Sequence, residues 1–160
     1  MGKTLVAYFS CSGVTEKLAK KLASVVDGDL YRIEPAVPYT DTDLNWRDQK
    51  SRSTIEMQDK KSRPEIAGKV RNMDDYNVVY VGFPIWWYIA PTIINTFLES
   101  YNFSGKTVIP FATSGSSDIG DTDKWLHASC SQETRWRPAK RFGHPFSEMT
   151  LKTWVNNLNL

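Results

Sequence analysis

The sequence predicts a doubly wound α/β fold with one five-stranded parallel sheet, and two features of its hydrophobic patterning carry that prediction. Three continuous apolar segments, residues 4–9, 78–83 and 107–112, have strand length and are rich in β-branched and aromatic residues. Such runs are typical of strands that are covered on both faces. Helical periods lie between them, and strands that alternate with helices imply right-handed crossovers in a parallel sheet. With two weaker strands, the expected strand order is 2-1-3-4-5.

The first 34 residues are expected to supply two strands and one helix. After the strand Thr4–Phe9, apolar residues that follow Gly13 recur on one helical face, namely Val14, Leu18, Leu22, Val25 and Val26. A weaker strand is expected at Leu30–Glu34. This strand–helix–strand order is the first βαβ unit of the predicted sheet.

The polar segment Pro38–Arg63 is longer than a simple crossover needs. Its Trp46, Ile55 and Met57 indicate a helix packed on the sheet edge. Two readings of the segment are open: a solvated helix with loops, or a lid over a site.

The second half of the chain is expected to supply three strands and three helices. Pro91 suits a first helical turn, and the helix behind it would bury Ile93, Ile94, Phe97 and Leu98. A fourth helix is expected around Thr122–Cys130, a last strand near Thr134–Arg137, and a last helix capped by Ser147. Pro110 is awkward in a central strand because it lacks an N–H, so it is expected at a bulge or near the strand end.

Length and composition describe one folded domain, residues 1–160, and exclude several classes of protein. The hydrophobic content of 41% fits a folded protein, and the net charge of +2 with scattered Lys and Arg gives no support to nucleic-acid binding. The apolar run 78–90 is too short to span a membrane. Two cysteines provide neither a disulfide framework nor a metal site. The first ten residues are typical of a strand and not of a signal peptide, so a cytoplasmic location is expected.

The loop after the first strand has the features of a phosphate-binding site. A strand–loop–helix junction presents unpaired backbone N–H groups and the positive end of the helix dipole. Gly13 permits close approach of a ligand to the backbone, and hydroxyl donors come from Ser10, Ser12 and Thr15. The loop lacks the P-loop ending and the dinucleotide spacing, which favours a monoester phosphate. An ordinary serine-capped helix start is the alternative reading.

A second alternative for this loop is phosphatase chemistry. Low-molecular-weight tyrosine phosphatases share the topology and place a nucleophilic Cys here, with an Arg six residues later. Cys11 stands at that position, but Lys17 replaces the Arg, and an ammonium group does not form the planar bidentate clamp on a phosphoryl group. The chain also has no Asp-Pro dipeptide for a general acid. Cys11 is therefore interpreted as a loop residue that contributes its backbone N–H.

Two further loops follow strands at the same edge of the predicted sheet. The segment from Pro84 to Tyr88 is rich in aromatic residues, and Thr113 to Ser117 is small and hydroxyl-rich. Ligands of doubly wound folds bind at the carboxyl ends of the strands. An aromatic plug or a partner interface is the alternative for the first of these loops, and a plain turn for the second. Together, a phosphate site, a flat aromatic wall and a polar loop predict flavin mononucleotide (FMN) as the ligand.

The sequence also resembles the flavodoxin-like family, in particular its short bacterial flavoproteins. The stretches that carry the likeness are AYFSCSGVTEKLA, SRSTIEMQDKKSRPEI, GFPIWWYIAPTIINTFLESYNFSGKTVIPFATSGSSDIG and LKTWVNNL. The resemblance implies that the phosphate is held by Ser10, Ser12, Gly13, Val14 and Thr15. It places Pro84, Ile85, Trp86 and Trp87 beside the isoalloxazine, and Thr113, Ser114, Gly115 and Ser116 at its pyrimidine side.

Three positions depart from the family pattern. Val14 replaces an Asn of many flavodoxins, which removes one side-chain contact but keeps the N–H. Ser116 and Asp118 stand where relatives often carry Gly, so the third loop must adjust if either position needs a positive φ.

Two redox roles and one other role remain open from the sequence. The chain is expected to act either as an electron carrier that docks on a redox partner protein or as a small reductase that passes electrons from NAD(P)H to a quinone-like acceptor. Carrier flavodoxins tend to be strongly acidic, which steers them to basic partners, and the mildly basic charge here argues against a standard carrier. A flavin-free protein-binding module of the same fold is the alternative from another class.

Overall fold

The computed structural model describes residues 3–115 and 117–160, and its element order confirms the doubly wound α/β prediction. The strands of the main sheet are β1 (Lys3–Tyr8), β2 (Asp29–Arg32), β5 (Tyr76–Pro84), β6 (Thr107–Thr113), β7 (Arg135–Trp136) and β8 (Lys140–Phe142). The helices are α1 (Val14–Val26), α2 (Arg52–Gln58), α3 (Thr92–Glu99), α4 (Thr122–His127) and α5 (Glu148–Leu158), with a 3₁₀ turn η1 (Met73–Asp75). Two short strands, β3 (Glu34–Pro35) and β4 (Ile66–Ala67), pair with each other outside the main sheet.

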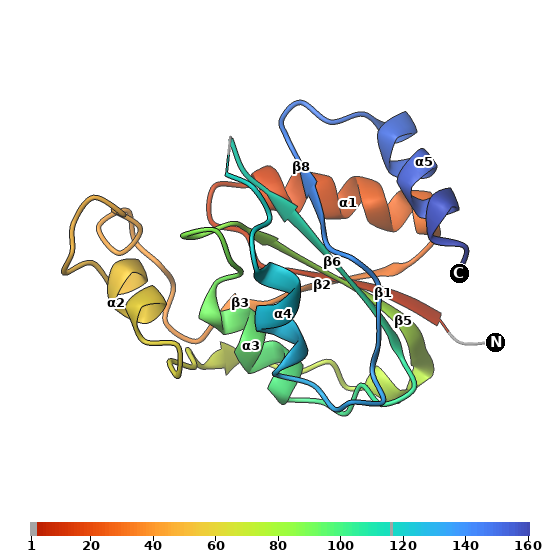
Figure 1. Ribbon diagram of the computed structural model, residues 1–160, viewed down its shortest axis with the longest axis horizontal. Coiled ribbons are helices and arrows are strands. Elements are labelled where there is room, and N and C mark those ends of the chain that lie inside the picture. Colours follow the sequence, from red (N-terminus) through yellow and green to blue (C-terminus); the bar gives the residue numbers. More distant parts are fainter. Residues whose placement is uncertain (1–2, 116) are drawn as a thin grey trace.

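The main sheet has the order β2-β1-β5-β6-β7 with parallel pairing throughout, which is the expected 2-1-3-4-5 order in chain numbering of the five strands. β8 also pairs with β6, a strand that sequence reasoning missed. Figure 1 shows α1 and α5 on one face of the sheet and α3 and α4 on the other. None of the helices within the described residues has the length and apolar character that crossing a bilayer would require.

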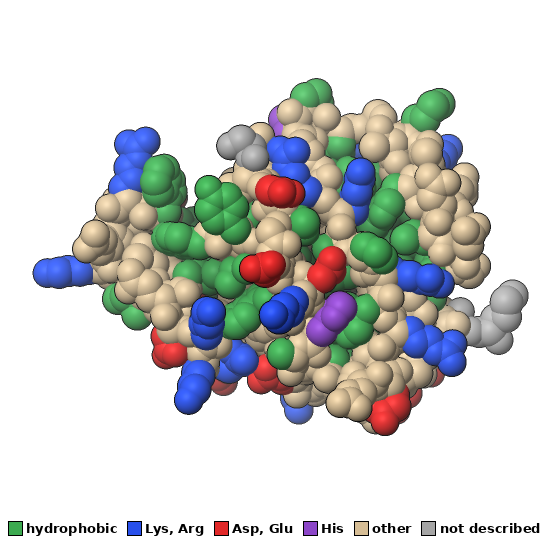
Figure 2. Space-filling view, viewed as in Figure 1, with side chains coloured by type: hydrophobic (Ala, Val, Ile, Leu, Met, Phe, Trp, Pro, Cys, Tyr) green, Lys and Arg blue, Asp and Glu red, His purple; other side chains and the backbone are tan. Residues whose placement is uncertain are grey.

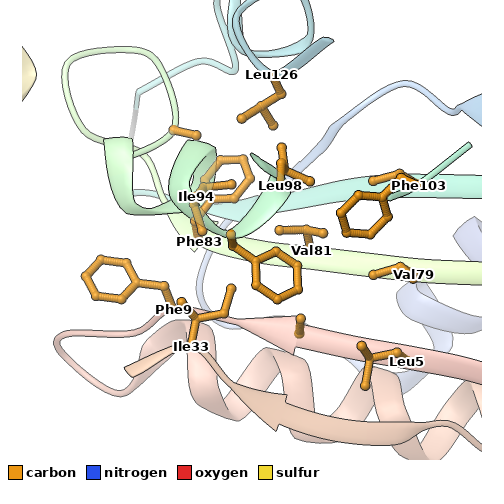
Figure 3. Close-up of a cluster of buried hydrophobic side chains, with 14 of the residues drawn as sticks. Leu5, Phe9, Ile33, Val79, Val81, Phe83, Ile94, Leu98, Phe103 and Leu126 are labelled. Carbon is orange, nitrogen blue, oxygen red and sulfur yellow. The ribbon is translucent and has the colours of Figure 1, made fainter. Parts of the chain in front are cut away.

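Side-chain alternation along the central strands builds one hydrophobic core on each face. In β1, Leu5 and Ala7 join the cluster under α3 and α4, whereas Val6 and Tyr8 join the cluster under α1 and α5. Figure 3 shows the first cluster, with Phe83 beneath α3. Each fully buried large apolar side chain contributes about 1.5–3 kcal/mol relative to an exposed one. The sheet thus behaves as a rigid support for the loops at its ends.

The strand register brings the ends of the three central strands to one level. Tyr8 of β1 pairs with Gly82 of β5, and Pro84 of β5 pairs with Thr113 of β6. All three strands run in the same direction, so their carboxyl ends form one rim. The loops that follow them are therefore neighbours in space.

Pro110 corrects one expectation, because it lies in the middle of β6 and pairs with Val81 without a bulge. The N–H of Arg137 donates to the carbonyl of Val108, so even-numbered residues of β6 face the β7 and β8 side. There, β7 pairs with residues 107–108 and β8 with residues 111–113. The missing N–H of Pro110 thus faces the gap between two short strands, where no ladder bond is lost.

The Pro38–Arg63 segment corrects a second expectation. It contains only the short α2, which is capped by the Ser51 side chain and lies beyond the carboxyl rim, away from the sheet edge (Figure 1). Met57 is buried, but Trp46 and Ile55 are 66% and 55% exposed. Two of the three apolar residues that indicated packing on the sheet edge therefore face solvent.

The close contact between Gly82 and Phe111 gives a test of how tightly the central strands are packed. A Cβ on Gly82 would lie 2.2 Å from Cζ of Phe111, whose ring covers the glycine. Gly82→Ala should lower the free energy of unfolding by about 2–3 kcal/mol through overpacking, measured by denaturant titration. In the Gly82→Ala background, Phe111→Leu should cost clearly less than it does alone. Additive effects of the two substitutions would contradict this packing.

Candidate functional site

Three loops meet at the carboxyl rim: loop 1 (residues 9–13), loop 2 (residues 85–91) and loop 3 (residues 114–121, with residue 116 outside the described part). The N–H of Phe9 donates to Gly82 at 2.9 Å, and the N–H of Ile85 donates to Thr113 at 3.0 Å. The hydroxyls of Thr15 and Thr113 share a buried hydrogen bond of 2.7 Å. These bonds join β1 to β5, β5 to β6 and α1 to β6 at the base of the loops.

Loop 1 delivers α1 to the rim with its first turn uncapped. Gly13 has φ of 91°, a left-handed conformation that a glycine adopts without strain, and its N–H donates to the Ser10 hydroxyl at 3.2 Å. Ser51 and Ser147 cap α2 and α5, whereas no described side chain caps α1. The N–H groups of its first turn are consequently free for a ligand, and the helix dipole favours an anion.

The predicted phosphate residues occupy different depths in loop 1. Ser10 and Thr15 are buried, Gly13 and Val14 are half-buried, and Cys11 and Ser12 are exposed at the surface. The Thr15 hydroxyl shares its hydrogen bond with Thr113, and the backbone N–H of Thr15 is available to a ligand. Loop 1 therefore offers mainly backbone N–H groups, with the Ser12 hydroxyl at its mouth.

One carboxylate stands in the first turn of α1, and its charge is compensated. Glu16 accepts hydrogen bonds of 2.9 Å from both the Tyr8 hydroxyl and the Arg32 guanidinium. The hydrogen bond from Tyr8 and the charges of Lys20 and Arg32 lower the pKa of Glu16. Pairing with Arg32 reduces the repulsion that an anion at loop 1 would meet from this carboxylate.

The chemistry of Cys11 does not suit a nucleophile. Cys11 has surface exposure as a residue, but the chain packed around its thiol desolvates that group and raises its pKa to about 12, although the charges of Arg32 and Arg52 act in the opposite direction. A nucleophilic cysteine needs a lowered pKa, because the thiolate is the reactive form. Lys17, in the place of a phosphatase arginine, is exposed. The geometry thus supports the interpretation of Cys11 as a loop residue.

Loop 2 contains a strained two-residue turn that presents aromatic side chains to solvent. Trp86 and Ile89 exchange N–H···O bonds of 3.0 and 3.1 Å around Trp87 and Tyr88, whose φ angles are 49° and 67°. Positive φ at both central positions is the geometry of a type I′ turn, which normally carries Asn and Gly. Such conformations cost about 1–3 kcal/mol for each residue and cluster at functional sites. Trp87 is 43% exposed and Tyr88 63% exposed.

Trp86 is held at the rim by an aromatic cluster that sequence reasoning missed. Its ring contacts those of Phe9 and Tyr39 edge-to-face at centroid distances of 5.7 and 5.6 Å. Tyr39 comes from the Pro38–Arg63 segment, donates its hydroxyl to Glu56, and carries the guanidinium of Arg52 at 3.8 Å from its ring centroid. Arg52 also donates to Glu56 at 3.0 Å. The segment is thereby fastened to the site.

Hydrophobic side chains gather around this part of the surface (Figure 2). The exposed aromatic residues of the region are Trp46, Trp87 and Tyr88. On the β2 side of loop 1 lies a cavity of about 330 Å³, lined by Phe9, Ser10, Cys11, Arg32, Glu34, Pro35, Ala36, Pro38, Tyr39 and Ala67. The rim therefore has an apolar, aromatic character beside the polar donors of loop 1.

Loop 3 is held in place by Arg141 of β8. The Arg141 guanidinium donates to the Ser114 hydroxyl at 2.8 Å and to the carbonyls of Ser114 and Gly115 at 3.0 Å each. The Ser114 hydroxyl in turn donates to the carbonyl of Ser117 at 2.5 Å. Thr113 is buried, Ser114 half-buried and Gly115 exposed. The fourth predicted residue of this group, Ser116, lies outside the described residues.

The structure thus brings the three predicted groups of site residues to one rim and adds Tyr39, Arg52 and Arg141. Arg141 belongs to a basic stretch that reads as charge on an edge strand, and only the pairing of β8 with β6 shows that it reaches loop 3. The Arg52–Glu56 spacing of four residues is a further sequence signal for a helix here, beside Ile55 and Met57. No signal in the sequence places Arg52 or Arg141 at the rim.

Comparison with known proteins identifies relatives over nearly the full chain. The family model described as flavodoxin matches residues 3–158. The chain is similar to a candidate flavoprotein from Bacteroides uniformis ATCC 8492, with 50% identity and a TM-score of 0.91 over 97% of this chain and 98% of the other. A second candidate flavoprotein, from Bacteroides eggerthii DSM 20697, has 44% identity and a TM-score of 0.92 over 100% and 99% of the two chains.

A more distant structure shares the fold. It is a flavoprotein in complex with FMN from Lactobacillus acidophilus NCFM, with 23% identity and a TM-score of 0.71 over 97% of this chain and 99% of the other. Among curated proteins, none matches the chain.

The raised pKa of Cys11 gives a direct chemical test of loop 1. With a thiol pKa of about 12, Cys11 should react with iodoacetamide at pH 8 in the folded protein at least about a hundredfold more slowly than an unperturbed thiol. Mass spectrometry of the tryptic peptide measures the rate, with the urea-unfolded protein as the control. Rapid alkylation of Cys11 in the folded protein would contradict a protonated thiol and would reopen the reading as a nucleophile.

Proposed function

The chain belongs to the flavodoxin family, and on this premise we propose that it binds FMN at the carboxyl rim of its sheet and acts as a redox flavoprotein. The observation that carries the proposal is the uncapped first turn of α1 beside two further loops at one level of the rim. A helix N-terminus at the end of a parallel strand is suited to a phosphate group. The nucleotide then extends from loop 1 toward loops 2 and 3.

The donors of loop 1 fit a phosphate monoester. The backbone N–H groups of Ser12, Val14 and Thr15 would hold it, together with the Ser12 hydroxyl. Gly13 leaves open space at the position of a side chain, since nothing lies within 4 Å of a Cβ built there. A ligand can therefore approach the backbone closely. The exposed Cys11 N–H completes the proposed phosphate site, with Ser10 supporting the turn through its bond to Gly13.

The aromatic and polar loops fit the two ends of an isoalloxazine ring. Trp86 and Trp87, with Pro84 and Ile85 at their base, would provide flat apolar contacts for the ring system. On the other side, Thr113, Ser114 and Gly115 would face the pyrimidine edge, and Ser116 belongs to the same proposed group. The half-buried Trp86 is fixed by Phe9 and Tyr39, so the wall it forms is preorganised.

Bound FMN supplies one- and two-electron redox chemistry, and the protein sets its orientation and surroundings. Rings at the rim would shield one side of the isoalloxazine from water, and the neutral N–H and hydroxyl donors of loop 1 would hold the phosphate without cancelling its charge. We infer a role in electron transfer or as a small NAD(P)H- or quinone-type oxidoreductase. The net charge of +2 supports the second role, because it lacks the negative field that steers acidic carriers to basic partners.

A charge placed in loop 1 tests the phosphate site. Ser12 is exposed, and an aspartate before α1 is compatible with the helix dipole, so Ser12→Asp should fold normally. It should weaken FMN binding at least about tenfold by repulsion of the phosphate, and leave riboflavin binding unchanged. Fluorescence titration of each flavin measures both affinities.

The matched control is Ser24→Asp, which makes the same change of net charge on an exposed residue at the other end of α1. It should bind FMN as the unchanged protein does. Equal losses of FMN affinity in both variants, or equal losses for FMN and riboflavin in Ser12→Asp, would place the phosphate elsewhere.

The two redox roles separate in a stopped-flow experiment with the FMN-loaded protein. Rapid bleaching of the flavin absorbance near 450 nm after mixing with NADPH would identify a reductase. No bleaching with NADPH or NADH, together with rapid reduction by a chemical reductant, would identify a carrier that needs a separate reductase. A protein that stays colourless in excess FMN would favour the flavin-free binding module.

A further inference from the structure

Arg141 makes an unusually complete set of contacts with a loop that has little structure of its own. It donates to three acceptors in two consecutive residues, the Ser114 hydroxyl and the Ser114 and Gly115 carbonyls, at 2.8–3.0 Å. A guanidinium presents its donors in a rigid planar fork, so it fixes the positions of the acceptors relative to one another. Arg141 is itself held by the pairing of β8 with β6, where it stands opposite Ala112.

The contacts determine which way the loop peptides face. In a planar trans peptide the C=O and the following N–H point in opposite directions. Because the Ser114 carbonyl points at Arg141, the N–H of Gly115 points away from it. Arg141 therefore holds the acceptors of Ser114 and Gly115 on its own side and leaves the N–H of Gly115 on the opposite side of the loop.

Within residues 3–115 and 117–160, the charge of Arg141 has no ion-pair partner. Among the described residues, no carboxylate lies within 4.0 Å of its guanidinium, whereas Arg32, Arg52 and Arg63 each pair with a glutamate. Neutral carbonyls and a hydroxyl satisfy its hydrogen bonds and leave the positive charge in place. A half-buried, unpaired cation thus stands behind loop 3 at the rim.

We propose that Arg141 is a positioning residue for the flavin: it holds loop 3 with the Gly115 N–H toward the pyrimidine side of FMN, and its charge favours the reduced, more negative cofactor over the oxidised one. This inference rests on the proposed function. Arg141 lies in β8, the second strand along the chain after loop 3, and is thereby part of the proposed binding site.

Two substitutions separate the geometry from the charge. Arg141→Lys keeps the charge but loses the planar fork, and Arg141→Met loses both. The control is Arg135→Met, which removes an exposed arginine of β7 at the opposite end of β6. In NMR relaxation of the flavin-free proteins, the backbone order parameters of Gly115, Ser117 and Asp118 should fall below about 0.6 in both Arg141 variants, and Arg135→Met should leave them unchanged.

Binding of the two redox states provides the second readout. Arg141→Met should weaken oxidised FMN about tenfold and reduced FMN about a hundredfold, because loss of the loop geometry affects both forms and loss of the charge affects the reduced form more. Arg141→Lys should weaken both forms by the same factor, about tenfold. Anaerobic titration of each form with each variant measures these affinities.

The outcomes separate this inference from the proposal on which it rests. Unchanged order parameters in loop 3, or FMN affinities equal to those of the unchanged protein, would overturn the positioning role while FMN binding stands. Equal losses for the two redox states in Arg141→Met would overturn the role of the charge. Failure of the unchanged protein to bind either form of FMN would overturn the proposed function, and the inference with it.

Discussion

The parallel, in-register pairing of β1, β5 and β6 is the constraint on which the site depends. Because these strands are buried on both faces and end at one level, their loops have no freedom to lie apart. The Thr15–Thr113 hydrogen bond then joins the beginning of α1 to the end of β6 across the rim. Packing fixes the support, and a few polar contacts place the loops on it. The rim is a consequence of the fold before any ligand is considered.

The three loops use different physical means to hold their positions. Loop 1 relies on backbone conformation and leaves its donors free, loop 2 stores strain in the Trp87–Tyr88 turn, and loop 3 is held from outside by Arg141. Free donors and positive φ angles are both costs to stability that a well-packed core can offset. Their concentration at one rim, away from the regular interior, is the pattern expected of a site shaped for binding.

Sequence patterning was sufficient for the parts of the molecule governed by hydrophobic periodicity. The buried strands and α1 lie where the apolar runs indicate them, and the strand order is the predicted one. Sequence patterning failed where contacts between distant segments determine the position of a residue. Pro110 is tolerated in the middle of β6 because β7 and β8 leave a gap beside it. Ile55 faces solvent although its pattern indicates burial. The predicted loops are neighbours as expected, but Tyr39, Arg52 and Arg141 reach the rim through contacts that are distant in sequence.

The divided edge beside β6 has a consequence for behaviour at high concentration. An unprotected edge strand can pair with the edge of another molecule, and this is a common route to aggregation. Here the outer edge consists of two fragments, Arg135–Trp136 and Lys140–Phe142, separated by a turn of chain that contains Pro138. Neither fragment offers an uninterrupted row of backbone donors and acceptors long enough to template an incoming strand. The same proline-associated gap that permits Pro110 in the sheet interior thus helps to keep separate molecules from joining edge to edge.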